Sequence, residues 1–236
     1  MAATIGAAGQ GRKRRLDAGG DDMARWHMAD EEQDLDRAYA LKTPEDSVRY
    51  YRDWAADYDR DFAAGMEYRS PGVVAAAYAA LGGGGPVLDV GAGTGLVGQA
   101  LSSKGVSPID GLDISPEMLA EAREKRVYRA TILADLTKTL PIPDATYSGC
   151  VSAGTFTHGH VGPSAFAELL RVTAPGAIFA VTVHSAVYEA LGFAQAFVAL
   201  SDRIGQFRTE PFGLYGPGAT GEHRDDTGWL VSFRCR

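Results

Sequence analysis

The sequence predicts an α/β domain with a mostly parallel, doubly wound sheet and helices on both faces. From Pro86 onward, short apolar runs alternate with segments of helical periodicity, a pattern typical of strand–helix–strand units. The chain has 236 residues, of which 45% are hydrophobic and 22% charged, which is enough for one such domain and short for two. We expect the domain to occupy residues 43–236.

Residues 1–42 have a different composition and are expected to form a poorly ordered tail. The stretch is rich in glycine and charge and has neither helical nor strand periodicity. Arg12–Arg15 carry four positive charges, which is also compatible with a nuclear signal or a nucleic-acid arm. The seven acids between Asp21 and Asp36 would cancel that field within a Debye length of about 8 Å, which favours a solvated tail.

Two helices are expected before the sheet begins. The first starts with Thr43 as N-cap and Pro44 at the first helical position, and Gly65 ends it. The second has Ser70 as N-cap and runs through "VVAAAYAAL" to the breaker "GGGG".

Strands and helices then alternate to the end of the chain. The apolar runs predict strands at residues 87–90, 106–113, 128–135, 145–154, 176–184 and 227–235. The helical segments between them are residues 94–103, 116–125, 163–172 and 186–203. In such a sheet, the loops at the carboxyl ends of the strands form the ligand crevice.

The stretch "VLDVGAGTGLVG" contains two overlapping glycine patterns. One is Gly91, Gly93 and Gly95 in alternation, and the other is the dinucleotide fingerprint that starts at Gly93 and includes Gly98. The strand ends at Val90, so the turn that needs positive φ angles must start at Gly91. The first register therefore fits the strand, and the free N–H groups of the following helix point at the ligand.

Three acidic residues indicate which nucleotide cofactor this loop binds. Asp89 would repel a pyrophosphate beside the turn, whereas it can help to hold the cationic S-adenosylmethionine, which has no phosphate. Asp113 ends the second strand, where a carboxylate accepts hydrogen bonds from ribose hydroxyls. Asp135 and Leu136 follow the third strand, where they can meet the amine and the ring face of adenine.

The motifs "LDVGAGTG", "GLDISPEML", "AD" and "LLRVTAPGAIF" together resemble the successive motifs of class I S-adenosylmethionine-dependent methyltransferases. More narrowly, "YYRDWAADYDRDF", "YRSPGVV" and "GTFTHGHVG" are similar to the branch that includes a methyltransferase-like protein of the Williams–Beuren syndrome region and its bacterial relatives. The resemblance covers roughly residues 45–183. It implies a seven-stranded sheet with a reversed terminal hairpin, which "QFRTEPF" and "TGWLVSFRC" would supply.

The resemblance also implies a role for the helices that precede the sheet. In related enzymes these helices fold over the cofactor, so Tyr58 and Asp59 are expected at its methionyl end. Arg69 is expected to bind the carboxylate of the cofactor through two hydrogen bonds from its guanidinium. With the residues derived above, the predicted cofactor contacts are Tyr58, Arg69, Asp89, Gly91, Gly93, Gly95, Asp113, Ile114, Met118, Asp135, Leu136 and Ser152.

Methyl transfer is an in-line displacement that needs positioning and exclusion of water, with no metal and no covalent nucleophile. A general base helps when the acceptor is a hydroxyl or a protonated amine. His158, in the loop after the fourth strand, is the candidate base, and a structural role in which the imidazole binds loop backbone is equally compatible with its position. Thr155 and Thr157 are alternatives that would orient the acceptor.

The amino-acid composition of the chain limits the kinds of partner that we expect. A net charge of −7 argues against a nucleic-acid partner, which requires clustered Lys and Arg, and the longest apolar runs are shorter than the roughly 20 residues of a membrane span. The two cysteines form no metal or redox motif, and a reduced cytoplasmic setting is expected. The sequence thus predicts a methyltransferase that acts on an O or N atom of a small molecule. An NAD-dependent oxidoreductase and a non-catalytic S-adenosylmethionine-binding protein remain as alternatives.

Overall fold

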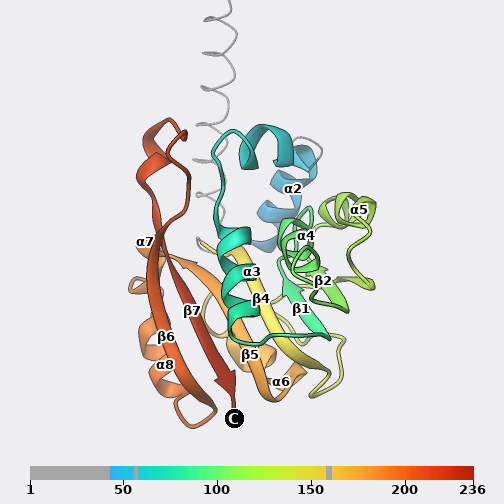
Figure 1. The fold of residues 1–236 in the computed structure, drawn as a ribbon, viewed down its shortest axis with the longest axis vertical. Coiled ribbons are helices and arrows are strands. Elements are labelled where there is room, and N and C mark those ends of the chain that lie inside the picture. The colour runs from blue at the N-terminus through green and yellow to red at the C-terminus, as the bar shows by residue number, and fades with distance from the viewer. Residues whose placement is uncertain (1–42, 56–57, 158–160) are drawn as a thin grey trace, which may run out of the picture.

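The computed structural model describes residues 43–55, 58–157 and 161–236, and shows helices packed on both faces of a central sheet (Figure 1). Within this part of the chain the sheet has seven strands in the order β3-β2-β1-β4-β5-β7-β6. Its strands are β1 (Val87–Val90), β2 (Ile109–Asp113), β3 (Ala130–Leu133), β4 (Tyr147–Phe156), β5 (Thr173–His184), β6 (Ile204–Gly213) and β7 (Thr227–Cys235).

The first five strands are parallel to one another and β7 is antiparallel to both of its neighbours. In register, Val87 of β1 lies opposite Ile109 of β2 and opposite Gly149 of β4, so the amino ends of these three strands lie together. The predicted fold class is therefore confirmed, including the reversed terminal hairpin formed by β6 and β7.

The helices form two layers. Buried residues of α3 (Ser70–Ala80) and α4 (Leu96–Ser102) pack on one face of the sheet, and those of α6 (Ala165–Val172) and α8 (Phe193–Ala199) on the other (Figure 1). Two aromatic pairs lie in the second layer: Phe156 stacks on Phe166 with ring centroids 5.0 Å apart, and Phe179 on Phe233 at 4.4 Å. The remaining helical elements are α2 (Pro44–Trp54), the π-helix η1 (Tyr58–Ala63), α5 (Pro116–Glu124), α7 (Ser185–Tyr188) and the 3₁₀-helix η2 (Glu222–Asp225).

Several predicted helices have different bounds in the structure. The second begins at Ser70 with Arg69 as its N-cap, and the helix predicted over 163–172 begins at Ala165. Three further differences concern where a helix ends, divides or starts. The first helix begins as expected, with the Thr43 hydroxyl accepting the N–H of Asp46, but it does not run to Gly65 as one helix: α2 ends at Trp54 and η1 follows. The helix predicted over 186–203 is divided into α7 and α8, because Gly192 is in the left-handed conformation at φ +74°. The helix after the glycine loop starts at Leu96, two residues later than expected, because Gly95 has φ +95°.

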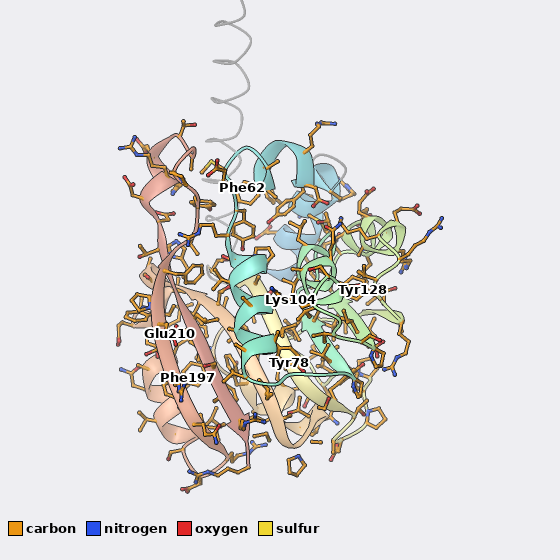
Figure 2. All side chains as sticks on the ribbon, viewed as in Figure 1. Phe62, Tyr78, Lys104, Tyr128, Phe197 and Glu210 are labelled. Atoms are coloured by element: carbon orange, nitrogen blue, oxygen red, sulfur yellow. The ribbon has the colours of Figure 1, made fainter. Side chains whose placement is uncertain are left out.

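Tyr78 anchors α3 to the sheet (Figure 2). Its side chain is fully buried and its hydroxyl donates a hydrogen bond of 2.6 Å to the carbonyl oxygen of Gly84. A Cβ added at Gly149 of β4 would overlap the Tyr78 ring. The ring can therefore lie flat on the sheet only because position 149 carries no side chain.

We expect Gly149→Ala to lower the free energy of unfolding by about 1–3 kcal/mol, because the methyl group overpacks the contact with Tyr78. Urea denaturation measures this change. Gly72→Ala is the matched control, because a Cβ at this exposed position of α3 meets no atom within 4 Å, and alanine is the better helix former by about 1 kcal/mol. Equal stability of the two variants would show that Tyr78 does not constrain position 149.

Candidate functional site

A cleft lies at the carboxyl ends of β1, β2 and β4, and η1 and α3 contribute to its wall. It encloses about 930 Å³, including the part open to solvent, which is within the range of small-molecule sites. Its walls combine main chain of the glycine loop with apolar, hydroxyl and carboxylate side chains. The lining residues are Tyr58, Tyr68, Pro71, Gly91, Ala92, Gly93, Thr94, Leu96, Val97, Leu112, Asp113, Ile114, Met118, Ala134, Asp135, Leu136, Thr137, Ala153, Gly154, Thr155 and Val161.

The glycine loop adopts the register that starts at Gly91. Strand β1 ends at Val90, and Gly91, Gly93 and Gly95 all have positive φ angles, of +64°, +53° and +95°. A Cβ at Gly91 would overlap Oγ1 of Thr155, so this position tolerates no side chain. A Cβ at Gly93 would meet no protein atom within 4 Å. Because Gly93 lines the cleft, the space beside its main chain is available to a ligand.

Asp113, the last residue of β2, links two segments of the cleft wall. One carboxylate oxygen accepts the backbone N–H of Gly93 at 2.8 Å, and the other accepts that of Ser115 at 2.9 Å. Burial raises the pKa of Asp113 above its usual value against the effect of these N–H groups. Each oxygen has a further lone pair, so the carboxylate can also accept hydrogen bonds from ligand hydroxyls.

Asp135 and Leu136 lie in the cleft after β3, where the sequence places them. One oxygen of Asp135 accepts the Thr137 N–H and hydroxyl at 2.8 and 2.7 Å, and the other faces Lys138 at 3.2 Å. Although burial raises the pKa of Asp135, these hydrogen bonds and the lysine lower it below the usual range. Asp135 is thus ionised at neutral pH.

Four predicted residues do not line the cleft. Asp89 is fully buried beside Tyr128, and Ser152 donates to the Val90 carbonyl oxygen at 2.7 Å. Gly95 is the N-cap of α4 and faces the Tyr128 ring. Arg69 is exposed, and its guanidinium donates to the carbonyl oxygen of Gly213 at 3.5 Å. The structure brings together Tyr58, Gly91, Gly93, Asp113, Ile114, Met118, Asp135 and Leu136, whereas His158 lies outside the described residues.

Asp59, which the sequence places beside Tyr58 at the ligand, instead ties η1 to the glycine loop. Its carboxylate accepts the Thr94 hydroxyl at 2.5 Å and pairs with the Lys125 ammonium at 2.5 Å. Lys125 also donates to the carbonyl oxygen of Thr94 at 2.6 Å. Lys125 lies 31 residues from Thr94 in the sequence, and no local pattern marks it as a partner of the loop.

Tyr68 is a wall residue that sequence reasoning missed. It lies in "YRSPGVV", where the neighbouring Arg69 was the predicted contact, and a Cβ at Gly154 would come within 2.7 Å of its hydroxyl oxygen. Burial raises the pKa of Tyr68 to about 12, so the phenol is neutral at physiological pH and acts as a hydrogen-bonding group. With Tyr58 and Phe62 it forms an aromatic cluster at the top of the cleft; Figure 2 labels Phe62 in this region.

The charges of the cleft distinguish between nucleotide cofactors. Among the described lining residues, Asp113 and Asp135 are the charged ones and both are acidic. A pyrophosphate bound here would meet two carboxylates and no compensating cation, at a cost that Coulomb's law makes large in a half-buried site. The open space beside Gly93, the spare acceptor capacity of Asp113 and this charge pattern fit S-adenosylmethionine better than a dinucleotide.

Sequence comparisons find methyltransferases. A model of a methyltransferase domain matches residues 88–181. Human methyltransferase-like protein 27 is 32% identical over 174 residues, which are 72% of this chain and 70% of that protein. Malonyl-[acyl-carrier protein] O-methyltransferase of Serratia marcescens is 35% identical over 92 residues, 39% of this chain and 35% of that protein. An 18S rRNA (guanine-N(7))-methyltransferase of Bos taurus is 42% identical over 66 residues, 28% of this chain and 23% of that protein.

The fold is also found in solved structures. The N-methyltransferase NodS of Bradyrhizobium japonicum, in complex with S-adenosylhomocysteine, has a TM-score of 0.59 at 15% identity and covers 80% of this chain and 98% of its own. The DhpI complex with S-adenosylhomocysteine has a TM-score of 0.58 at 20% identity and covers 82% of this chain and 96% of its own. At these identities the likeness concerns the fold.

None of the helices in the described part of the chain is both long and apolar enough to cross a bilayer. Within the same residues, histidine, cysteine and carboxylate side chains form no group of three that could hold a metal ion.

The tie between η1 and the glycine loop should be measurable as a coupling energy. We expect Asp59→Ala and Lys125→Ala to be non-additive by about 0.5–1 kcal/mol in urea unfolding, with partial screening because the Asp59 side chain is 37% exposed. Arg224→Ala and Asp225→Ala form the control cycle, since this pair is 61% and 85% exposed and should show no coupling. Full additivity at 59 and 125 would contradict the tie.

Proposed function

We propose that this chain, which belongs to the class I S-adenosylmethionine-dependent methyltransferases, binds its cofactor in the cleft after β1, β2 and β4 and methylates an O or N atom of a small molecule. The family and the cofactor rest on the comparisons, and the placement in the cleft rests on the glycine loop with Asp113. The observation that carries the placement is the space beside Gly93, which is bounded by main chain and by the carboxylate of Asp113.

Each part of the cleft wall has a role in this proposal. Asp113 accepts hydrogen bonds from the ribose hydroxyls, Ile114 and Leu136 flank the adenine, and Asp135 accepts from its exocyclic amine. The main chain of Gly91–Gly93 faces the methionyl part. S-Adenosylmethionine, when bound, supplies a methyl group that its sulfonium activates. The residues of this chain then need only to align the acceptor with that group and to exclude water.

The described residues at the acceptor end of the cleft are apolar or carry hydroxyl groups. Tyr58, Tyr68 and Pro71 come from the segments that precede the sheet, and Thr155 and Val161 from the β4 side. This wall suits a neutral or aromatic small molecule, because a polyanionic RNA backbone requires clustered cations and the chain has a net charge of −7. The relatives named for rRNA methylation match over 66 residues, so their acceptor is not transferred here.

His158 remains our candidate for a general base, and it lies outside the described residues. A base is needed only if the acceptor is a hydroxyl or a protonated amine. The hydroxyl of Thr155 donates to the Val90 carbonyl oxygen at 3.0 Å and lies 2.9 Å from the Ser152 hydroxyl, which donates to the same carbonyl. Its position is therefore well defined, which suits a residue that orients the acceptor.

The cofactor assignment is tested by isothermal titration of the full chain with S-adenosylhomocysteine and, separately, with NAD. We expect heat of binding with S-adenosylhomocysteine and none with NAD. Methyl transfer from S-adenosylmethionine across a panel of phenols, amines and carboxylic acids then distinguishes an enzyme from a non-catalytic binder. Binding of NAD in place of S-adenosylhomocysteine would overturn the assignment.

Asp113→Asn should weaken S-adenosylhomocysteine about tenfold, because an amide accepts fewer hydrogen bonds from ribose hydroxyls than a carboxylate. Asp110→Asn is the matched control on the same strand: Asp110 is buried at the opposite end of β2, where it pairs with Arg129. The control should lose stability and keep its affinity. Equal affinities of the two variants would remove Asp113 from the site.

A further inference from the structure

Three glycines at or near the glycine loop, Gly95, Gly98 and Gly111, leave space that the ring of Tyr128 fills. Tyr128 lies in the connection between α5 and β3, beside α4 and β2 (Figure 2). A Cβ at Gly98 of α4 would come within 2.5 Å of the ring, and a Cβ at Gly95 or at Gly111 of β2 within 3.1 Å. The third glycine of the dinucleotide-like pattern, Gly98, is thus explained by the tyrosine that packs against it.

The hydroxyl at the end of this ring reaches a buried acid. Tyr128 donates a hydrogen bond of 2.6 Å to one carboxylate oxygen of Asp89 in β1. Asp89 is fully buried, and its second oxygen has no hydrogen-bond partner among the described residues. The ring and the hydroxyl together connect β1, α4 and β2 behind the glycine loop.

We propose that Tyr128 is a positioning residue for the cofactor, which sets the shape of the loop from Gly91 to Gly95 by holding Asp89 at one end of it and Gly95 at the other. The loop starts two residues after Asp89, and Gly95 faces the Tyr128 ring, so both ends of the loop are held by the same side chain. This inference rests on the proposed placement of the cofactor in the cleft. Tyr128 itself does not line that cleft.

The charge of Asp89 gives the positioning role a pH signature. Burial raises the pKa of Asp89, the Tyr128 hydrogen bond lowers it, the nearby Asp113 charge raises it and the Gly98 N–H lowers it, and the result is a pKa of about 7. The titratable groups that face Asp89 are Tyr128 from the α5–β3 connection, Asp113 from β2 and Cys150 from β4, while α4 presents the Gly98 N–H. Loss of the Tyr128 hydroxyl removes a donor that favours the ionised carboxylate, so the pKa of Asp89 must rise.

The ionised form of Asp89 is the one that favours the cofactor. As a carboxylate Asp89 accepts the proton of the Tyr128 hydroxyl at 2.6 Å, whereas in a protonated carboxyl the added O–H must displace that donor or stay unpaired at the second oxygen. Its negative charge also attracts the ammonium group of the cofactor's methionyl part. Affinity for S-adenosylhomocysteine should therefore increase as the pH rises through about 7.

A second buried tyrosine–aspartate pair provides the matched control. Tyr147, the first residue of β4, donates a hydrogen bond of 2.9 Å to Asp110 at the opposite end of the sheet. Tyr147→Phe and Tyr128→Phe each remove one buried phenolic hydroxyl, so both should lower the melting temperature. Only Tyr128→Phe removes a group behind the glycine loop.

The test is titration calorimetry with S-adenosylhomocysteine between pH 5.5 and 8.5, with melting temperatures recorded for each variant. At pH 7, Tyr128→Phe should bind about 3–10-fold more weakly than wild type, with the pH midpoint of affinity moved upward and the loss smaller at pH 8.5. Tyr147→Phe should keep the wild-type affinity and midpoint. Asp89→Asn should bind without a midpoint near pH 7, because it removes the titrating group.

Two results would overturn the proposal. One is that Tyr128→Phe and Tyr147→Phe have the same affinity for S-adenosylhomocysteine and the same pH midpoint. Tyr128 would then contribute to packing and not to the position of the cofactor. The other is a midpoint that persists in Asp89→Asn. A wild-type chain that does not bind S-adenosylhomocysteine would instead refute the placement of the cofactor, so the two failures are distinguishable.

Discussion

The path of the main chain between Val90 and Leu96 determines how the other segments of the cleft are arranged. Within this short loop the chain must turn from a buried strand into a helix and still leave open space beside Gly93 at the cleft. Glycines at 91, 93 and 95 adopt the positive φ angles of this path without strain, and Thr155 occupies the volume that a side chain at 91 would need. The neighbouring segments follow from that path: β2 ends in a carboxylate that accepts the Gly93 N–H, and η1 is attached to the Thr94 hydroxyl.

Around this loop, acidic groups take three different roles because their surroundings differ. Asp113 is half-buried at the cleft and is held by main-chain N–H groups, whereas Asp135 is stabilised as an anion by Thr137 and Lys138. Asp89 is fully buried behind the loop, with a pKa raised to about 7. A cleft with two carboxylates and, among the described lining residues, no cation disfavours phosphate-rich ligands and favours a ligand with a positive charge.

Local patterns predicted the fold and placed most of the predicted contact residues at the candidate cleft. The strand–helix alternation and the turn after Val90 are properties of short segments, and the glycines, Asp113, Asp135 and Leu136 follow strands directly in the sequence. The sequence did not predict which way individual side chains point. The sequence places Asp89 two residues before Gly91, but its side chain points away from the cleft toward Tyr128, 39 residues later. Arg69 carries the charge that suits a carboxylate, yet it faces Gly213, 144 residues away. No spacing rule gives such partners, because β2, α5 and the terminal hairpin bring them together.

The contact of η1 with the loop has a kinetic consequence. Because η1 contributes Tyr58 to the cleft wall and is held by the Asp59–Lys125 pair, opening of this pair releases the part of the wall that η1 forms. The Lys125 side chain is mostly buried and that of Asp59 is more than a third exposed. Dissolved cations therefore reach the Asp59 carboxylate more easily than dissolved anions reach the Lys125 ammonium. The residence time of a bound cofactor should therefore shorten as ionic strength increases. The packing of the Tyr128 ring behind the loop is not an ion pair and should remain in place.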